Sequence, residues 1–285
     1  MATVRSKPAR SSTKGNATPT KVWLWLTAPI TALVAIAAGS GLFVEGLYRD
    51  APYFVAQAVG QDLITLVVAL PVLVISAILT ARGSHRANLV WLGILVYLVY
   101  SYVIYALAVQ FNPLFLVYVA LLGFSLYALI GGLATTDFAG IKARFSRETP
   151  AKAASIFLVV LAALFYFMWL SETIPALLAG EVPQSVTDNG TPTNAVHVLD
   201  MAWILPAMLL SSFWLWKRRA LGYTLAGVML TFGTMIVLAV MAMVVSMSLL
   251  GQAVAIGQAA IFAIVAAVIL GMLAWYLRGL GESQR

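Results

Sequence analysis

Eight long runs of apolar residues restrict what this chain of 285 residues can fold into. A helix that crosses the hydrocarbon core of a bilayer needs about 20 apolar residues, because an unpaired backbone amide in lipid costs several kcal/mol. Runs of that length lie at roughly 22–44, 62–81, 88–110, 114–134, 153–177, 197–216, 221–249 and 255–277. The pattern predicts an all-α, polytopic transmembrane helix bundle of about eight spans.

The composition agrees with lipid as the main solvent of this chain. Hydrophobic residues make up 62% of it and charged residues only 9%, whereas a soluble domain is about half apolar and about a quarter charged. An ordinary soluble domain, a disordered chain and a nucleic-acid-binding domain are therefore excluded. The runs divide the chain into a basic tail at 1–21, predicted to be disordered and cytoplasmic, a bundle at 22–278 and a cytoplasmic tail at 279–285.

Basic residues indicate how the bundle is oriented. On an eight-span path, sixteen of the seventeen Lys and Arg residues fall on one side, and only Arg49 falls on the other. Lysine and arginine are enriched in cytoplasmic loops, so both termini are expected in the cytoplasm. The net charge of +7 is explained by this topology and requires no anionic macromolecular partner.

Acidic residues show the opposite bias, which topology does not explain because acids contribute little to orientation. Seven of the ten fall on the outer side: Glu45, Asp50, Asp62, Glu172, Glu181, Asp188 and Asp200. At a rise of about 1.5 Å per residue, Asp62 lies roughly 30 Å from Arg82, and Asp200 roughly 26 Å from Lys217. These distances place Asp62 at the outer edge of the hydrocarbon and Asp200 slightly deeper.

Several polar residues could partner these acids. His197 precedes Asp200 by three residues and therefore shares its helix face, while Tyr97, Ser101 and Tyr105 recur every four residues along the third run. Ionisable groups within a membrane tend to face the protein interior or a water-filled path. The alternative is that each group only caps or ends its helix at the wet interface. The candidates for an outward-facing site that binds a solute or a proton are Asp62, Glu172, His197, Asp200, Gln57, Gln61, Tyr105 and Asn112.

Two prolines suggest an internal repeat of four spans. When Pro71 is set against Pro206 without gaps, Asp62 falls against His197 and Arg82 falls against Lys217. Parallel repeats of this kind occur in transporters, where helices interrupted by proline flank the binding site. The alternative is that each proline only produces a local kink.

Several kinds of chemistry lack the residues they need. The chain contains no cysteine, which excludes thiol chemistry, zinc sites with cysteine ligands and iron–sulfur clusters. Its two histidines, His85 and His197, lie on opposite sides of the predicted membrane, so they cannot ligate one haem or contribute to one three-histidine zinc site. We expect no cofactor and no metal, and assign no catalytic residue.

Three functions remain open from the sequence. The first is a transporter of a small solute, which could be linked to protons through Asp200 and His197. The second is a membrane-embedded enzyme or assembly factor acting on a lipid or a periplasmic partner, with His197 as base and Asp200 orienting it. The third is a non-catalytic membrane or sensor subunit. The expected partners are the lipid bilayer and a small-molecule solute, and no nucleic acid.

A set of short segments resembles a group of uncharacterised bacterial polytopic membrane proteins. The segments are Gly60-Gln61-Asp62, Pro71, Arg82-Gly83-Ser84, the tyrosines of the third run and Asn112-Pro113-Leu114-Phe115. The resemblance covers roughly residues 40–220. It implies a multi-pass protein of the bacterial inner membrane and adds weight to the outer polar residues, but it implies no particular activity.

Overall fold

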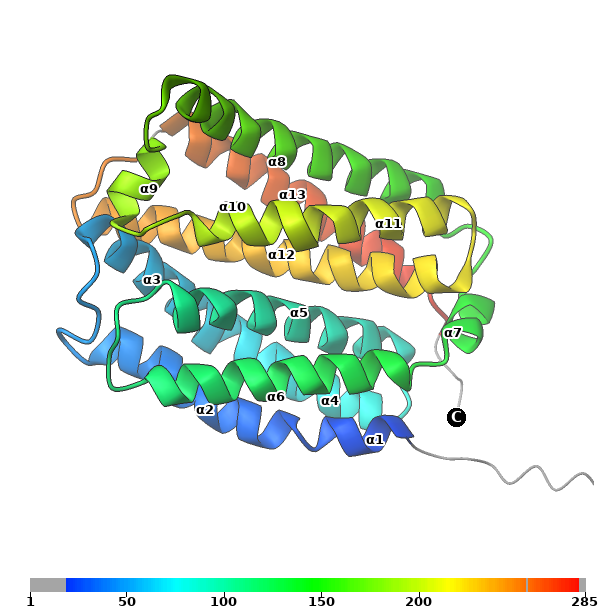
Figure 1. The fold of residues 1–285 in the computed structure, drawn as a ribbon. Coiled ribbons are helices and arrows are strands. Elements are labelled where there is room, and N and C mark those ends of the chain that lie inside the picture. Colours follow the sequence, from blue (N-terminus) through cyan, green and yellow to red (C-terminus); the bar gives the residue numbers. More distant parts are fainter. Residues whose placement is uncertain (1–18, 255, 282–285) are drawn as a thin grey trace, which may run out of the picture.

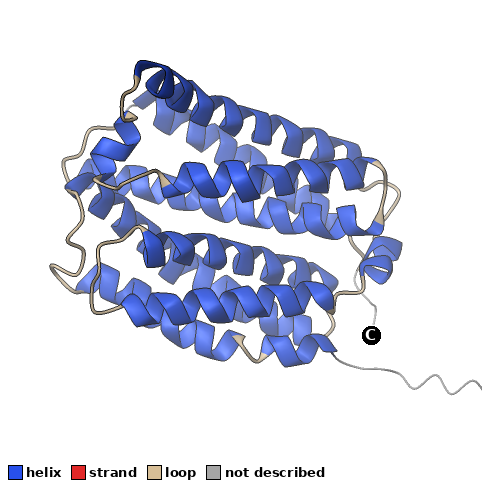
Figure 2. Cartoon of the chain, viewed as in Figure 1, coloured by secondary structure: helices blue, strands red, loops and turns tan. Residues whose placement is uncertain are grey.

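A computed structural model describes residues 19–254 and 256–281 and confirms the all-α prediction. Within these residues, helices joined by short loops account for the whole architecture (Figure 2). Eight helical segments in the described ranges are long and apolar enough to cross a membrane: Val22–Phe43, Pro52–Ala81, His85–Leu107, Phe115–Ala134, Ala151–Ala179, Ala195–Trp216, Ala220–Leu249 and Ala259–Arg278. The chain is therefore a multi-pass membrane protein.

Each span consists of one helix or of two to three consecutive helical segments. The first four spans contain α1 (Pro19–Leu24), α2 (Thr27–Phe43), α3 (Pro52–Ile64), η1 (Thr65–Ala69), α4 (Leu70–Ala81), α5 (His85–Leu107) and α6 (Phe115–Ala134). The short α7 (Phe138–Arg144) then leads to the second half. That half contains α8 (Ala151–Ala179), α9 (Gln184–Asn189), α10 (Ala195–Leu199), η2 (Asp200–Ile204), α11 (Leu205–Trp216), α12 (Ala220–Leu249) and α13 (Ile256–Arg278).

The two halves lie side by side, with one central helix in each (Figure 1). Helix α5 is the most buried span, because 78% of the residues in its apolar stretch are buried inside the protein. The corresponding share for α12 is 61%. Helix α3 of the first half packs along α12 of the second. The remaining spans direct large apolar side chains outward, as a bundle solvated by lipid requires.

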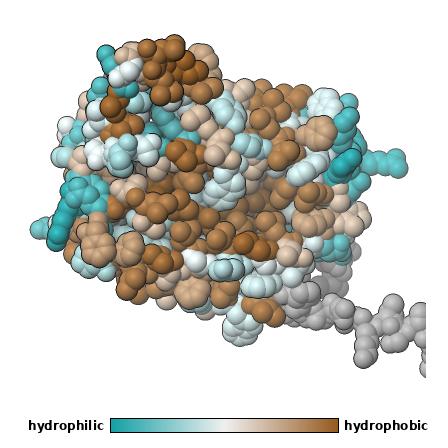
Figure 3. Space-filling view, in the orientation of Figure 1, coloured by the Kyte–Doolittle hydropathy of each residue, from teal (hydrophilic) through white to brown (hydrophobic). Residues whose placement is uncertain are grey.

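On the face shown in Figure 3, the most hydrophilic residues collect at the two ends of the bundle, and the side between them is mostly apolar. Both described chain ends lie at the same end (Figure 1), in agreement with an even number of spans. We call this the basic end, and it includes the loops 82–84, 135–150 and 217–219. The opposite, acidic end includes the loops 44–51, 108–114 and 180–194.

The start of the second span corrects the sequence prediction. The predicted start at 62 is ten residues late, because the helix begins at Pro52. Gln57, Gln61 and Asp62 made this stretch resemble a helix entrance, but all three make contacts inside the protein. Asp62 therefore lies about 15 Å into its helix rather than at its edge. Of the predicted tails, residues 1–18 and 282–285 lie outside the described residues.

The two prolines produce the same local structure in both halves. Each follows a wide π-helical turn, closed by a hydrogen bond from the Leu70 amide to the Thr65 carbonyl and from the Leu205 amide to the Asp200 carbonyl. Proline has no amide hydrogen and clashes with the carbonyl four residues earlier, and a wider turn relieves this conflict. Three elements of the second half start 135 residues after their counterparts in the first half. The π turns start at 65 and 200, the helices that follow them at 70 and 205, and the central helices at 85 and 220. The structure thus extends the correspondence predicted from the two prolines.

Glycines allow the halves to approach closely at their interface. A Cβ atom at Gly60 on α3 would lie 2.5 Å from the Cα of Met243 on α12. Such a distance is too short for any side chain, so the two backbones are in direct contact there. This crossing lies two residues before Asp62 and fixes the face that α3 presents to α5.

Candidate functional site

Asp62 is the most enclosed carboxylate among the sequence candidates, with 3% of its surface exposed. Its Oδ2 accepts a hydrogen bond of 2.5 Å from the Tyr48 hydroxyl, and its Oδ1 accepts one of 2.9 Å from Tyr105. Tyr48 belongs to the loop 44–51 and Tyr105 to α5, so the loop and the central helix meet at this side chain. The groups that interact with Asp62 among the described residues are these hydroxyls rather than a cation.

A glycine makes room for the Asp62 carboxylate. A Cβ atom at Gly41, near the end of α2, would overlap the Asp62 Oδ2 atom and lie 2.6 Å from the Tyr48 hydroxyl. Gly39, two residues earlier and therefore on the opposite side of α2, has open space around it. The absence of a side chain at Gly41 is therefore required for the carboxylate to reach its two hydroxyl donors.

Four tyrosine rings surround this carboxylate, and we call Asp62 with Tyr48, Tyr102, Tyr105 and Tyr118 the tyrosine cage. Tyr105 contacts the other three rings, with centroids 6.3 Å from Tyr48, 5.6 Å from Tyr102 and 5.3 Å from Tyr118. Edge-to-face and tilted arrangements of this kind are favourable between aromatic rings. The cage combines an aromatic wall with hydroxyl groups that can donate or accept a hydrogen bond.

A second polar layer lies next to the cage on α3 and α5. The Gln61 amide nitrogen donates to the Tyr97 hydroxyl at 2.9 Å and to Ser101 at 2.8 Å. Thr65 lies 2.7 Å from the same Tyr97 hydroxyl and donates to the Gln61 carbonyl at 2.8 Å. This layer therefore connects the Asp62 segment to the π turn, and confirms that the polar face of the third run points into the protein.

Three buried polar atoms on the acidic-end side of the Asp62 carboxylate have no hydrogen-bond partner among the described residues. They are Asp50 Oδ2, Asn112 Nδ2 and the Tyr118 hydroxyl. Asn112 and Tyr48 are polar neighbours of Tyr118, and the Asp62 and Asp50 carboxylates also act on it electrostatically. The other Asp50 oxygen accepts a hydrogen bond from the Gln110 amide at 2.8 Å, which holds Asp50 beside the loop containing Asn112. Buried groups of this kind are satisfied by ordered water when there is room for it.

Two side chains of the loop 44–51 have a raised pKa. Burial raises the pKa of the Asp50 carboxyl above its ordinary value of 3.8. Burial, and then the adjacent Asp62 charge, raise the pKa of the Tyr48 hydroxyl well above its ordinary range. Tyr48 therefore keeps its proton at any physiological pH and remains a hydrogen-bond donor to Asp62.

Asp200 belongs to a separate network in the second half. Its Oδ2 accepts a hydrogen bond of 2.8 Å from the Trp169 indole on α8, and Tyr100 on α5 also interacts with this carboxylate. It borders a small cavity of about 30 Å³ between α8, α11 and α12, whose other lining residues include Phe165, Ile204 and Phe232. Asp200 is the first residue of the π turn, the position that Thr65 occupies in the first half.

His197 and Glu172 lie closer to the acidic end in this second network. The His197 ring packs against Trp169 at an interplanar angle of 35°, with centroids 4.3 Å apart, and its Nε2 lies 3.7 Å from the Glu172 carboxylate. Glu172 in turn accepts a hydrogen bond of 2.8 Å from the Ser185 amide of α9. Both His197 and Asp200 thus contact Trp169, as expected from their shared face, but the acid that faces the imidazole is Glu172.

The eight sequence candidates therefore divide between two networks and do not form one site. Asp62, Gln61 and Tyr105 meet in the first half, with Asn112 on the side of the acidic end. Glu172, His197 and Asp200 meet in the second half. Gln57 joins neither network, since its side chain donates to Asn189 at 3.0 Å and ties α3 to α9.

Sequence reasoning missed the aromatic partners of both carboxylates. Tyr48, Tyr118 and Trp169 lie on other helices or loops, and their contacts depend on how each helix is rotated in the bundle. One signal was present, because Ala37 and Gly41 form a small-residue pair that predicts close contact of the first span. Gly41 is the residue that admits the Asp62 carboxylate.

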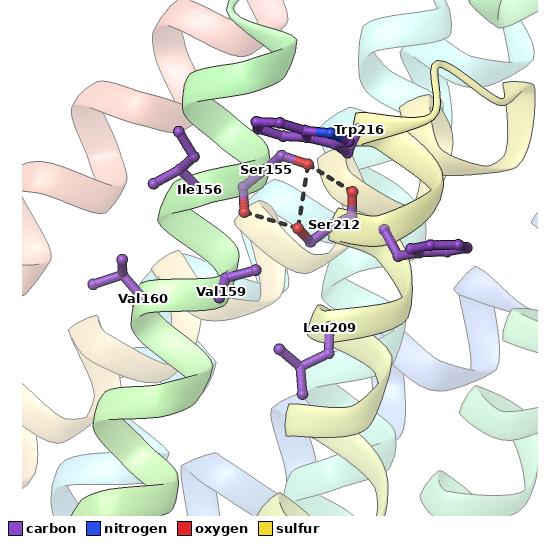
Figure 4. A pocket seen from close by; sticks show the side chains of 8 residues that line it. Ser155, Ile156, Val159, Val160, Leu209, Ser212 and Trp216 are labelled. Atoms are coloured by element: carbon purple, nitrogen blue, oxygen red, sulfur yellow. Dashed lines mark hydrogen bonds between the residues drawn. The ribbon is translucent and has the colours of Figure 1, made fainter.

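An open groove lies on the side of the bundle, apart from these two networks (Figure 4). It has a volume of about 320 Å³, lies between α8 and α11, and is lined by Ser155, Ile156, Val159, Val160, Leu209, Ser212, Phe213 and Trp216. At its floor, Ser155 donates to the Ser212 carbonyl at 2.6 Å and Ser212 donates to the Ser155 carbonyl at 2.9 Å. This reciprocal pair joins the two helices.

Metal ligands do not gather in the part of the chain that the structure describes, where no group of three or more His, Cys, Asp or Glu side chains could hold an ion. The two networks combine carboxylates with hydroxyl, amide, indole and imidazole groups. No protein-family model, curated protein or solved structure matches the chain.

Proposed function

We propose that this protein is a proton-linked transporter of a small solute in the bacterial inner membrane, with Asp62 as the proton-binding group. The observation that carries the proposal is the enclosure of this carboxylate within a membrane-spanning helix, where its partners are tyrosine hydroxyls. A charge at such a depth is costly, and ionisable residues within membrane spans commonly serve proton relays or ion paths. A carboxylate that is only structural would be expected to pair with a cation.

The internal repeat supports transport over a static role. Parallel repeats related by an axis along the membrane normal occur in secondary transporters, with binding sites where interrupted helices face the interface between halves. Here both interrupted spans carry their carboxylate at or just before the π turn, Asp62 in the first half and Asp200 in the second. Turns of this type are frequent at functional sites.

The unpartnered polar atoms at the acidic end provide a route for the proton. Water held by Asp50, Asn112 and Tyr118 would connect the acidic end to the Tyr48 hydroxyl and so to Asp62. The positive-inside rule places this end outside the cytoplasm. Protons would therefore reach Asp62 from the outer side.

The test is proton movement in proteoliposomes loaded with a pH-sensitive dye and challenged with panels of sugars, amino acids and organic acids. The wild-type protein should change the internal pH with at least one panel. Asp62→Asn should abolish this change, because the amide cannot take up the proton. Asp188→Asn, the same substitution at a half-buried position of α9 outside both networks, should leave it intact. Equal proton movement in wild type and Asp62→Asn would refute the role of Asp62.

A further inference from the structure

The groove between α8 and α11 has walls suited to a hydrocarbon chain. Its apolar side chains are 37–58% exposed, with Leu209 the least and Val160 the most exposed. The hydroxyls of Ser155 and Ser212 at its floor are already bonded to each other's carbonyls (Figure 4). An occupant of the groove would thus find apolar contacts and few free polar groups, as an acyl chain requires.

Basic side chains border this groove at one end only. Lys152 lies three and four residues before Ser155 and Ile156 on α8, and therefore on the same helix face. Lys217 directly follows Trp216 at the end of α11, and Arg218 comes next. Because α8 begins and α11 ends at the basic end, the exposed lysines meet above the same end of the groove.

We propose that this groove is a binding site for one anionic phospholipid from the leaflet at the basic end. One acyl chain would lie along Val159, Leu209 and Phe213, and the headgroup phosphate would lie between Lys152 and Lys217. Basic pockets between helices on this side of a membrane protein recognise anionic headgroups. Trp216 would lie at the level of the headgroup, where indole rings are favoured. The site is independent of the proton-binding role proposed for Asp62.

Native mass spectrometry of the detergent-solubilised protein tests this proposal, with phosphatidylglycerol and phosphatidylcholine of identical acyl chains as probes. Wild type should retain phosphatidylglycerol in preference to phosphatidylcholine. The double variant Lys152→Gln, Lys217→Gln should lose this preference by about 30-fold, since each lysine near an anionic headgroup contributes about 1 kcal/mol. The double variant Lys142→Gln, Arg144→Gln, on exposed positions of α7, removes the same charge from the basic end and should behave as wild type.

A second variant tests the apolar part of the site. Val159 is 43% exposed, so Val159→Trp should fold normally and fill the groove. It should reduce retention of both lipids, whereas the lysine variant should affect only the anionic one. Equal retention of the two lipids by wild type would overturn the proposal. The same conclusion would follow if the α7 control lost as much phosphatidylglycerol preference as the groove variant.

Discussion

The two halves of this bundle share the π turn and the register of the helices that follow it, but they have different polar interiors. In the first half, the central helix α5 directs Tyr97, Ser101 and Tyr105 towards α3 and contributes to the enclosure of Asp62. In the second half, the positions displaced by 135 residues on α12 hold Phe232, Ile236 and Val240. Asp200 relies instead on Trp169 of α8 and on Tyr100, which α5 contributes across the interface.

This difference distinguishes the residues that form the backbone structure from the residues that form the candidate site. Both halves form the π turn and the following helix, so the prolines and apolar packing are sufficient for the backbone. The tyrosine cage is present in one copy only and therefore is not a requirement of the repeat. Gly41, which makes room for the Asp62 carboxylate, also occurs in the first half alone, because the residue 135 positions later, in α8, is Ala176.

The largest effect is expected at Gly41. Gly41→Ala would force the Asp62 carboxylate away from its two hydroxyl donors, since the new Cβ overlaps it. Overpacking of this kind costs about 1–3 kcal/mol, and the loss of hydrogen bonds to the carboxylate adds to it. A clear drop in the midpoint of thermal unfolding in detergent should follow.

Gly39→Ala is the matched control, because it is the same change in the same helix with open space around the new methyl group. It should leave the midpoint unchanged or raise it, since alanine favours helix over glycine. Equal midpoints for the two variants would mean that the first half does not depend on the close fit at Gly41.

A smaller effect is expected at Tyr105. Tyr105→Phe leaves Asp62 Oδ1 without its donor while keeping the ring contacts of the cage. An unsatisfied buried acceptor costs about 1–3 kcal/mol. Tyr127→Phe removes a hydroxyl from a side chain that is 63% exposed and should have no measurable effect. If both variants unfold at the wild-type midpoint, the cage does not stabilise the carboxylate.

The smallest effect, and the same one in both halves, is expected from Pro71→Ala and Pro206→Ala. Each change restores an amide hydrogen and removes the reason for a wide turn, so the segments 65–69 and 200–204 should return to α-helix. The two unfolding midpoints should shift in the same direction, and hydrogen exchange should slow in both segments. A response confined to one half would mean that the two π turns are not equivalent, although their residue ranges correspond.

Apolar run length alone predicted the number and type of the spans. Eight runs correspond to eight spans, because a helix that crosses lipid must satisfy its own backbone. The boundary at Pro52 could not be predicted in this way. Gln57 and Asp62 look like interfacial residues in the sequence. Only the fold shows that Gln57 donates a hydrogen bond to Asn189 and that Asp62 accepts hydrogen bonds from Tyr48 and Tyr105.

The candidate site was only partly accessible from the sequence. Residues on one helix at spacings of three or four could be grouped, as His197 with Asp200 or Tyr97 with Tyr105. Contacts between helices depend on the rotation of each helix about its axis, which apolar sequences leave open. For this reason the pairing of Trp169 with Asp200, and the placement of Asp62 and Asp200 in different networks, emerged only from the structure.

The close contact between Gly60 and Met243 has a mechanical consequence. It joins α3 of one half to α12 of the other with no side chain between the backbones, two residues from Asp62. Because α3 packs along α12 and the backbones touch at this crossing, any side chain introduced at Gly60 would push the halves apart. It would displace the segment that carries Asp62, so the position of this carboxylate is tied to the distance between the halves.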